Sequence, residues 1–231
     1  QGDGLVWIHN CYTIEQYHCQ YFTTADSANG LICYSISIMA QLVINGPTPL
    51  NGEWHTAGSK NAVLPMLAAT LLCSEPVTLH NVPDLSDVDV MCEILDSLGA
   101  KVTRGAHQVQ IDSTHIHAGD IPEELTAKMR ASVLILGAAA ARTGDITIAQ
   151  PGGDIIGARP IASHLKAFQE LGYTVSVDNA STRVSGSSRG GRIILGELTV
   201  TGTENAIMAA CLGNHTTELR MVAVEPHVVD F

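Results

Sequence analysis

An internal repeat runs through most of the chain and restricts it to folds that are built from copies of one unit. One copy begins at Asn61 with "NAVLPMLAATLL" and the next at Ala131 with "ASVLILGAAAAR", so the period is about 70 residues. In each copy a helix of small apolar residues precedes a predicted strand, at residues 77–79 and 146–148. A loop with proline, an amphipathic helix ending in Leu-Gly and further strands follow. Helices that recur with strands indicate an α/β protein made of βαβαββ-like repeats.

A third copy opens at "TENAIMAACLGNHTTELRMVAVEPHVVDF" and stops before its second helix. The repeat therefore predicts a repeat-built domain over residues 60–229, with its third unit truncated, and a natural chain that continues past Phe231. Gly99 and Gly172 follow the two Leu-Gly helix ends, where a left-handed residue is expected.

Residues 1–38 differ in composition from the rest of the chain. They hold four of the five tyrosines, three of the six cysteines and none of the twelve lysines and arginines, and the first methionine is Met39. We interpret this segment as an extension foreign to the domain, either upstream sequence or an artefact; the alternative is a genuine extension that packs on the domain. From Met39 to residue 59 the pattern predicts strand, turn and strand before a helix. The absence of Lys and Arg from the segment argues against a signal peptide.

The overall charge and the cysteines limit the functional classes. A net charge of -11 argues against nucleic-acid binding, although a local cluster of cations can still bind a small anion. Cys73, Cys92 and Cys211 lie in apolar patterns, where buried free thiols are common, and this favours a reducing cytoplasm. No cysteine or histidine spacing indicates a metal site. No apolar run reaches the length of about 18 residues that a membrane-spanning helix needs.

Cations recur at predicted helix starts. Lys60 and Asn61 follow Ser59, a plausible cap; Arg130 opens the second copy; Arg159 directly precedes Pro160, which favours a first helical position. A cation there opposes the helix dipole by roughly 0.3–1 kcal/mol, so the recurrence suggests bound anions. The alternative is that these are solvated boundary residues.

Two further segments offer groups for a polar ligand. The third copy has "TVTGTEN" at residues 199–205, whose hydroxyls suit a sugar, a base or a phosphate ester, or else ordinary helix capping. His164 lies about one turn beyond Pro160 and could face the same ligand. The stretch "PGGDIIGARP", residues 151–160, reads as a mobile glycine-rich loop that presents Asp154 and Arg159 together, although Gly-Gly-Asp is also ordinary turn chemistry.

Seven motifs in order carry a family resemblance: "GSKNAVLPMLAATLL", "LSDVDVM", "LGAKV", "KMRAS", "PGGDIIGARP", "TGTENAIMAA" and "EPHVVD". Together they resemble the UDP-N-acetylglucosamine 1-carboxyvinyltransferases over about 190 residues, from Met39 to the end. The enolpyruvylshikimate phosphate synthases share the fold but match these motifs less well. The resemblance implies an inside-out α/β barrel of the enolpyruvyl transferase type. It places residues 39–59 in a second, otherwise missing domain, with the active site between the two.

The resemblance also implies an activity. The family transfers the enolpyruvyl group of phosphoenolpyruvate to the 3'-hydroxyl of UDP-N-acetylglucosamine and releases phosphate, the first committed step of peptidoglycan synthesis, in the cytoplasm. Neither a metal nor an organic cofactor takes part. The partners implied are the two substrates and the missing C-terminal half of the enzyme, without nucleic acid or membrane insertion. A chain with half the active-site cleft is expected to be inactive alone, and a non-catalytic UDP-sugar-binding module is the alternative.

By motif match, each site residue receives an expected role. Asp154 stands where the family has Cys or Asp and is expected to be the proton donor; the Cys form reacts with the epoxide fosfomycin, so resistance is expected here. Lys60, Asn61 and Arg159 are expected to bind phosphoenolpyruvate. The residues expected to bind UDP-N-acetylglucosamine are Arg130, Arg159, Pro160, Ile161, Ala162, Ser163, His164, Thr199, Val200 and Thr201. Val224 and His227 depart from the family pattern, which usually has an arginine and an acidic residue there.

Overall fold

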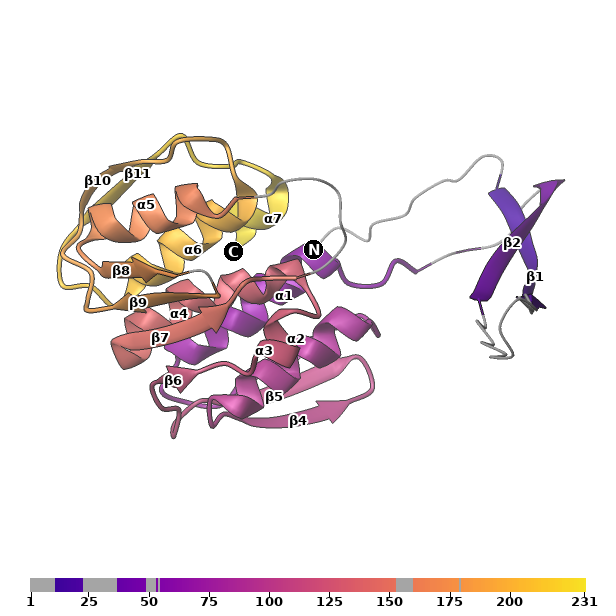
Figure 1. The fold of residues 1–231 in the computed structure, drawn as a ribbon, viewed down its shortest axis with the longest axis horizontal. Helices are drawn as coiled ribbons and strands as arrows, with labels where there is room; N and C mark the ends of the chain where they lie inside the picture. Colours follow the sequence, from indigo (N-terminus) through magenta and orange to yellow (C-terminus); the bar gives the residue numbers. More distant parts are fainter. Residues whose placement is uncertain (1–10, 23–36, 49–52, 54, 153–159, 179) are drawn as a thin grey trace, which may run out of the picture. The chain divides into compact units, whose positions relative to one another are not determined.

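A computed structural model describes residues 11–22, 37–48, 53, 55–152, 160–178 and 180–231 (Figure 1). The chain divides into two compact parts, residues 1–56 and 57–231. In the first, strands β1 (Cys11–Phe22) and β2 (Ser37–Thr48) pair antiparallel, so β2 crosses the boundary predicted between residues 38 and 39. The described residues among 49–59 form no second strand before the helix.

The second part contains the three repeat copies. The elements of the first copy are α1 (Lys60–Ala69), the 3₁₀ helix η1 (Thr70–Leu72), β3 (Val77–His80), α2 (Ser86–Ser97), β4 (Lys101–Gly105) and β5 (Gln108–Asp112). Those of the second are β6 (Gly119–Asp120), α3 (Glu123–Thr126), the 3₁₀ helix η2 (Arg130–Leu134), α4 (Ile135–Thr143), β7 (Asp145–Ala149), α5 (Ala162–Leu171), β8 (Thr174–Val177) and β9 (Ser181–Ser185). Those of the third are β10 (Gly191–Ile194), α6 (Val200–Cys211), β11 (Thr217–Arg220) and α7 (Pro226–Asp230).

The order of these elements confirms the α/β class and the repeat. The second copy gives the full βαβαββ order if the short α3 is set aside. Because Pro226–Asp230 is helical, the prediction that the third copy lacks a second helix is wrong. Proline suits the first turn of a helix, and Pro226 occupies it here. The left-handed glycines are confirmed, with φ of 93° at Gly99 and 101° at Gly172.

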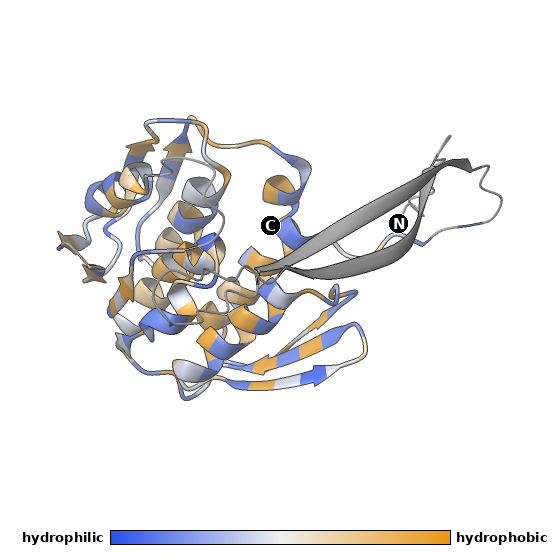
Figure 2. Ribbon diagram, turned by 45° about the vertical axis from the view of Figure 1, so that its right-hand side comes forward, coloured by the Kyte–Doolittle hydropathy of each residue, from blue (hydrophilic) through white to orange (hydrophobic). Residues whose placement is uncertain are grey.

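Among the described residues of the second part, three separate open sheets lie around the central helices. Their strand orders are β3-β5-β4, β6-β7-β9-β8 and β10-β11. Strands β7 and β9 pair antiparallel, with Ile146 opposite Val184, whereas β6 with β7 and β10 with β11 are parallel pairs. Figure 2 shows apolar residues along the central helices and alternating polar and apolar residues on outer strands. Helices therefore lie inside and sheets outside, and the described strands do not close a barrel.

The core is formed where α1, α4 and α6 pack against one another. Six consecutive residues of α4, "ILGAAA", are buried, which small side chains allow without steric conflict. Gly137 in α4 permits the closest approach, because a Cβ there would lie 2.4 Å from the backbone oxygen of Asn205 in α6. The packing thus brings the beginnings of the second and third copies together.

The three cysteines of this part of the chain differ in their exposure to solvent. Cys92 is buried as expected, but Cys73 is only partly buried and Cys211 is exposed, so burial of all three thiols is wrong. Cys211 is the last residue of α6 and lies where that helix reaches the surface.

The longest helices in the described part of the chain have twelve residues, and none is long and apolar enough to cross a bilayer.

Candidate functional site

A hollow of about 330 Å³ lies between the starts of η2 and α5 in the second copy and the start of α6 in the third. The residues that line it come from three segments distant in sequence, namely Arg130, Pro160, His164, Glu197, Leu198, Thr199 and Thr201. Five of these seven, all except Glu197 and Leu198, are among the residues predicted to bind UDP-N-acetylglucosamine. The structure therefore brings together five residues for which the resemblance predicted a common ligand.

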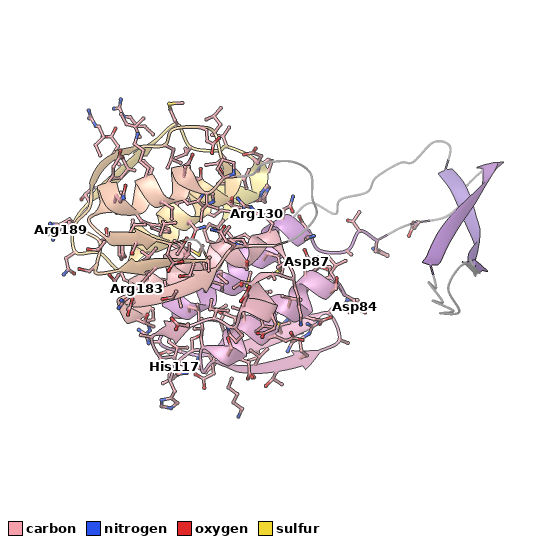
Figure 3. All side chains as sticks on the ribbon, in the orientation of Figure 1. Asp84, Asp87, His117, Arg130, Arg183 and Arg189 are labelled. Carbon is pink, nitrogen blue, oxygen red and sulfur yellow. The ribbon has the colours of Figure 1, made fainter. Side chains whose placement is uncertain are left out.

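Arg130 is the first residue of η2 and supplies the cation of the hollow (Figure 3). The extended conformation of Met129, at φ -149° and ψ 147°, ends the preceding turn and lets the helix begin at Arg130. The positive charge acts on the nearby imidazole of His164. An arginine at a helix start can bind an anion together with backbone N–H groups, because both present positive charge to it.

His164 projects from the first turn of α5 and is only 3% exposed. Its Nε2 lies 2.9 Å from Thr201 Oγ1, within hydrogen-bonding distance. Burial, reinforced by the positive charge of Arg130 and opposed by Glu197, lowers the pKa of His164 to about 4. The imidazole is therefore neutral at physiological pH and brings no charge to the hollow.

A second hydrogen bond joins the same two segments. Ser163 Oγ donates to Glu197 Oε1 over 2.6 Å, next to the contact between His164 and Thr201. The two contacts fasten the start of α5 to the residues around the start of α6. Sequence reasoning missed Glu197, although it lies only two residues before Thr199, and an acidic side chain beside that motif was the available signal.

Thr199 acts as a helix cap. Its Oγ1 accepts a hydrogen bond from the N–H of Gly202 over 3.3 Å, and its carbonyl accepts one from Thr203 Oγ1 over 2.8 Å. Of the two roles considered for this segment, ligand binding and helix capping, the hydrogen bond of the Thr199 hydroxyl corresponds to helix capping. At Ser59 the outcome is the reverse: it precedes α1 as predicted, but its side chain makes no capping hydrogen bond, so that expectation is wrong.

The remaining predicted residues lie elsewhere. Lys60 and Asn61 form the exposed first turn of α1 and do not line the hollow, and Lys60 Nζ pairs instead with Asp87 of α2. The helix after Pro160 begins only at Ala162, because Ile161 is its N-cap, so the prediction of Pro160 as first helical residue is wrong. Four more predicted residues lie at the starts of α5 and α6 without lining the hollow, namely Ile161, Ala162, Ser163 and Val200. Asp154 and Arg159 lie outside the described residues.

Of the three buried polar residues of α6, Thr203, Glu204 and Asn205, the last two were not predicted as site residues although their side chains are the most polar. Asn205 is fully buried, and its side chain accepts from Gly137 N over 2.8 Å and donates to the carbonyls of Val133 and Thr201, each over 3.1 Å. Glu204 is 1% exposed, and burial together with the charge of Glu225 raises its pKa to about 7. The sequence signal was "TEN" within an otherwise apolar helix.

Comparisons with known proteins identify the family of the chain. A family model described as EPSP synthase (3-phosphoshikimate 1-carboxyvinyltransferase) matches residues 44–231. The chain is 43% identical over 192 residues to the UDP-N-acetylglucosamine 1-carboxyvinyltransferase of Desulfatibacillum aliphaticivorans, a match that covers 83% of this chain and 46% of that protein. The chain thus spans about half the length of this curated relative.

Solved structures establish the fold independently of close sequence similarity. The enolpyruvyl transferase NikO from Streptomyces tendae matches with a TM-score of 0.65 at 21% identity, over 76% of this chain and 42% of NikO. An EPSP synthase from Acinetobacter baumannii matches with a TM-score of 0.59 at 12% identity, over 75% and 41% of the respective chains. The predicted fold type and the resemblance are therefore confirmed, and the chain belongs to the EPSP synthase family of enolpyruvyl transferases.

Proposed function

We propose that this chain is part of a UDP-N-acetylglucosamine 1-carboxyvinyltransferase and supplies the nucleotide-sugar side of its active site. The observation that carries the proposal is the hollow in which Arg130, Pro160, His164, Thr199 and Thr201 meet. Its chemistry suits a nucleotide sugar, because a cation and hydroxyls lie beside the apolar surfaces of Pro160 and Leu198. The 43% identity to a relative of that name supports the same substrate over the EPSP alternative.

The proposed reaction transfers the enolpyruvyl group from phosphoenolpyruvate to the sugar. Protonation at C3 of the enol makes C2 electrophilic, and the 3'-hydroxyl loses its proton as its oxygen attacks C2. The tetrahedral intermediate then loses phosphate from C2 and a proton from C3, which restores the double bond. Asp154 is the proposed proton donor, since a carboxyl beside bound phosphate holds its proton more tightly. Lys60, Asn61 and Arg159 are proposed to hold phosphoenolpyruvate, with Lys60 leaving Asp87 to do so.

We place the whole enzyme in the cytoplasm, where its soluble phosphorylated substrates occur, and propose that the rest of the protein completes the cleft. A positioned base and a complete phosphate clamp supply much of such a barrier. The chain by itself should therefore bind without turnover. Phosphate release above background from the purified chain with both substrates would contradict this.

Calorimetric titration tests the binding assignment. UDP-N-acetylglucosamine should bind the purified chain, and Arg130→Met should weaken binding by about tenfold or more, because a charge-assisted contact contributes roughly 1.5–3 kcal/mol. Arg183→Met is the matched control, since Arg183 pairs with Asp145 on the outer sheet. Binding of shikimate 3-phosphate in preference to the UDP-sugar would favour the EPSP alternative, and equal affinity of Arg130→Met would refute the site.

A second experiment tests Asp154. With UDP-N-acetylglucosamine present, fosfomycin should form a covalent adduct with the Asp154→Cys variant but not with the natural chain, because a thiolate is a far better nucleophile than a carboxylate. Intact-protein mass spectrometry reads the adduct directly and does not require turnover. An adduct on Asp154 itself would contradict the expected resistance.

A further inference from the structure

His164 and Thr201 form a buried pair whose hydrogen-bond roles can be worked out from their surroundings. His164 Nε2 lies 2.9 Å from Thr201 Oγ1, while His164 Nδ1 is buried and has no hydrogen-bond partner among the residues that the structure describes. The neutral imidazole carries one proton, either on Nδ1 or on Nε2. Which nitrogen holds it decides whether Thr201 accepts or donates.

Burial favours the proton on Nε2. A buried N–H group without a partner is rarer in proteins than a buried acceptor without one, because the unpaired donor loses a strong bond to water. A proton on Nδ1 would create such an unpaired donor, whereas a proton on Nε2 is donated to Thr201 Oγ1. Nδ1 then keeps its lone pair as an unpaired acceptor, which costs less free energy than an unpaired buried N–H group.

This assignment leaves the hydrogen of the Thr201 hydroxyl for another acceptor. Thr203, two residues further along α6, uses its hydroxyl to bond the carbonyl of Thr199, but within the described residues Thr201 Oγ1 has no contact of that kind and bonds only His164. The Thr201 carbonyl accepts from Asn205 Nδ2 over 3.1 Å, which fixes the backbone that carries the hydroxyl. Thr201 also lines the hollow together with Arg130.

We propose that His164 is a positioning residue that holds Thr201 as a hydrogen-bond donor to an anionic or carbonyl oxygen of the bound nucleotide sugar. The identity of the ligand rests on the proposed function, whereas the direction of the hydrogen bond does not. His164 itself need not touch the ligand. Its contribution is to occupy the acceptor side of the Thr201 hydroxyl.

Nitrogen-15 NMR of the ligand-free chain tests the direction of the bond. The His164 ring should show the Nε2–H tautomer at pH 7 and keep it down to about pH 5, since the pKa of His164 is about 4. Thr201→Val should perturb the ring signals because it removes the acceptor, and Thr201→Ser should restore them. A dominant Nδ1–H tautomer in the natural chain would overturn the proposal, whatever the ligand.

Titration with UDP-N-acetylglucosamine tests the consequence. Thr201→Val should weaken binding by about tenfold, and Thr201→Ser should stay within about threefold of the natural chain, since one hydrogen bond to a charged group is lost or kept. Thr78→Val, on β3 away from the hollow, is the matched control. Equal affinity of Thr201→Val and the natural chain would overturn the donor role. If the natural chain does not bind at all, the proposed function and the ligand role fail, and the NMR result alone decides the hydrogen bond.

Discussion

The first and third repeat copies have a similar backbone but differ in the polarity of the side chains that they bury. In sequence, "VTLHNVPDLSDVDVM" of the first copy corresponds to "TELRMVAVEPHVVDF" of the third, and α1 corresponds to α6. Both copies place a left-handed residue after the strand, Asn81 at φ 56° and Met221 at φ 55°. The backbone is thus repeated closely even where the side chains differ.

The side chains inside the two helices differ in polarity. Leu64 and Pro65 of α1 are buried and apolar, whereas the corresponding residues of α6 are Glu204 and Asn205. In α1 the burial of apolar surface stabilises the packing. In α6, Asn205 replaces part of that contribution with three hydrogen bonds, one each to α4, to η2 and to its own helix. The third copy therefore gains a fixed orientation beside the hollow and depends on buried polar groups for it.

The contacts to the following helix differ as well. Lys60 pairs with Asp87 at the surface of the first copy, and the corresponding residues of the third copy are Val200 and His227. His227 Nε2 lies 4.0 Å from Glu204 Oε1, and in the described part of the chain neither atom has a hydrogen-bond partner. The third copy thus moves its pairing one turn inward, from the surface to a buried carboxyl group.

The largest effect is expected from Asn205→Ala. It leaves Gly137 N–H and the Val133 carbonyl buried without partners, at about 1–3 kcal/mol each, so we expect a loss of roughly 4 kcal/mol in the free energy of unfolding. Urea unfolding followed by circular dichroism measures it. Asn205→Asp keeps the size and one acceptor and serves as a graded control. A loss below about 1 kcal/mol would mean that α6 is held by apolar contacts, as α1 is.

Glu204→Leu gives α6 the residue that stands at the corresponding position of α1, Leu64. The pKa of Glu204 is raised from 4.5 to about 7 in the folded chain, so between these pH values the unfolded chain releases the proton first and stability falls as pH rises. The favourable contribution is complete below about pH 4.5 and lost above about pH 7. The variant should remove this fall and stabilise the chain at pH 8 by on the order of 3 kcal/mol.

Unfolding curves from pH 4 to 8 measure that difference. Glu225→Gln is the control, because it removes the neighbouring charge and should weaken the pH dependence without abolishing it. The natural chain could instead be equally stable at pH 5 and pH 8 while Glu204→Leu is not. That result would contradict the claim that Glu204 lowers the stability of the chain as pH rises.

Met221→Asn gives the third copy the left-handed residue of the first. Asparagine tolerates this conformation better than methionine, so we expect a gain of about 0.5–1 kcal/mol. The reciprocal Asn81→Met should lose a similar amount. Thermal unfolding of both variants measures the pair, and changes of the same sign would show that local side-chain contacts outweigh the backbone preference.

The smallest effect is expected from Lys60→Met. Lys60 is exposed and Asp87 is partly exposed, and an ion pair at the surface contributes about 0–1 kcal/mol. The free energy of unfolding should therefore change by less than about 0.5 kcal/mol. The double variant with Asp87→Asn isolates the pairing energy. A larger coupling would indicate that the pair holds α1 to α2 and that Lys60 is not available to a substrate.

The sequence by itself determined the features that depend on local chemistry and periodicity. The 70-residue repeat, the alternation of helices and strands, the helix starts at Lys60 and Arg130 and the left-handed Gly99 and Gly172 could all be predicted, because each follows from hydrophobic spacing or from the conformational preference of neighbouring residues. The family motifs also predicted five of the seven residues that line the hollow as ligand-binding residues.

The tertiary structure alone decided which of those residues meet. Lys60 and Arg130 both begin helices, yet only Arg130 lines the hollow, and Glu197 enters it because α5 and α6 pack side by side. The burial of the polar Glu204 and Asn205 inside an otherwise apolar helix has the same origin. Contacts between residues far apart in sequence set burial, pairing and pKa, and no local pattern encodes them.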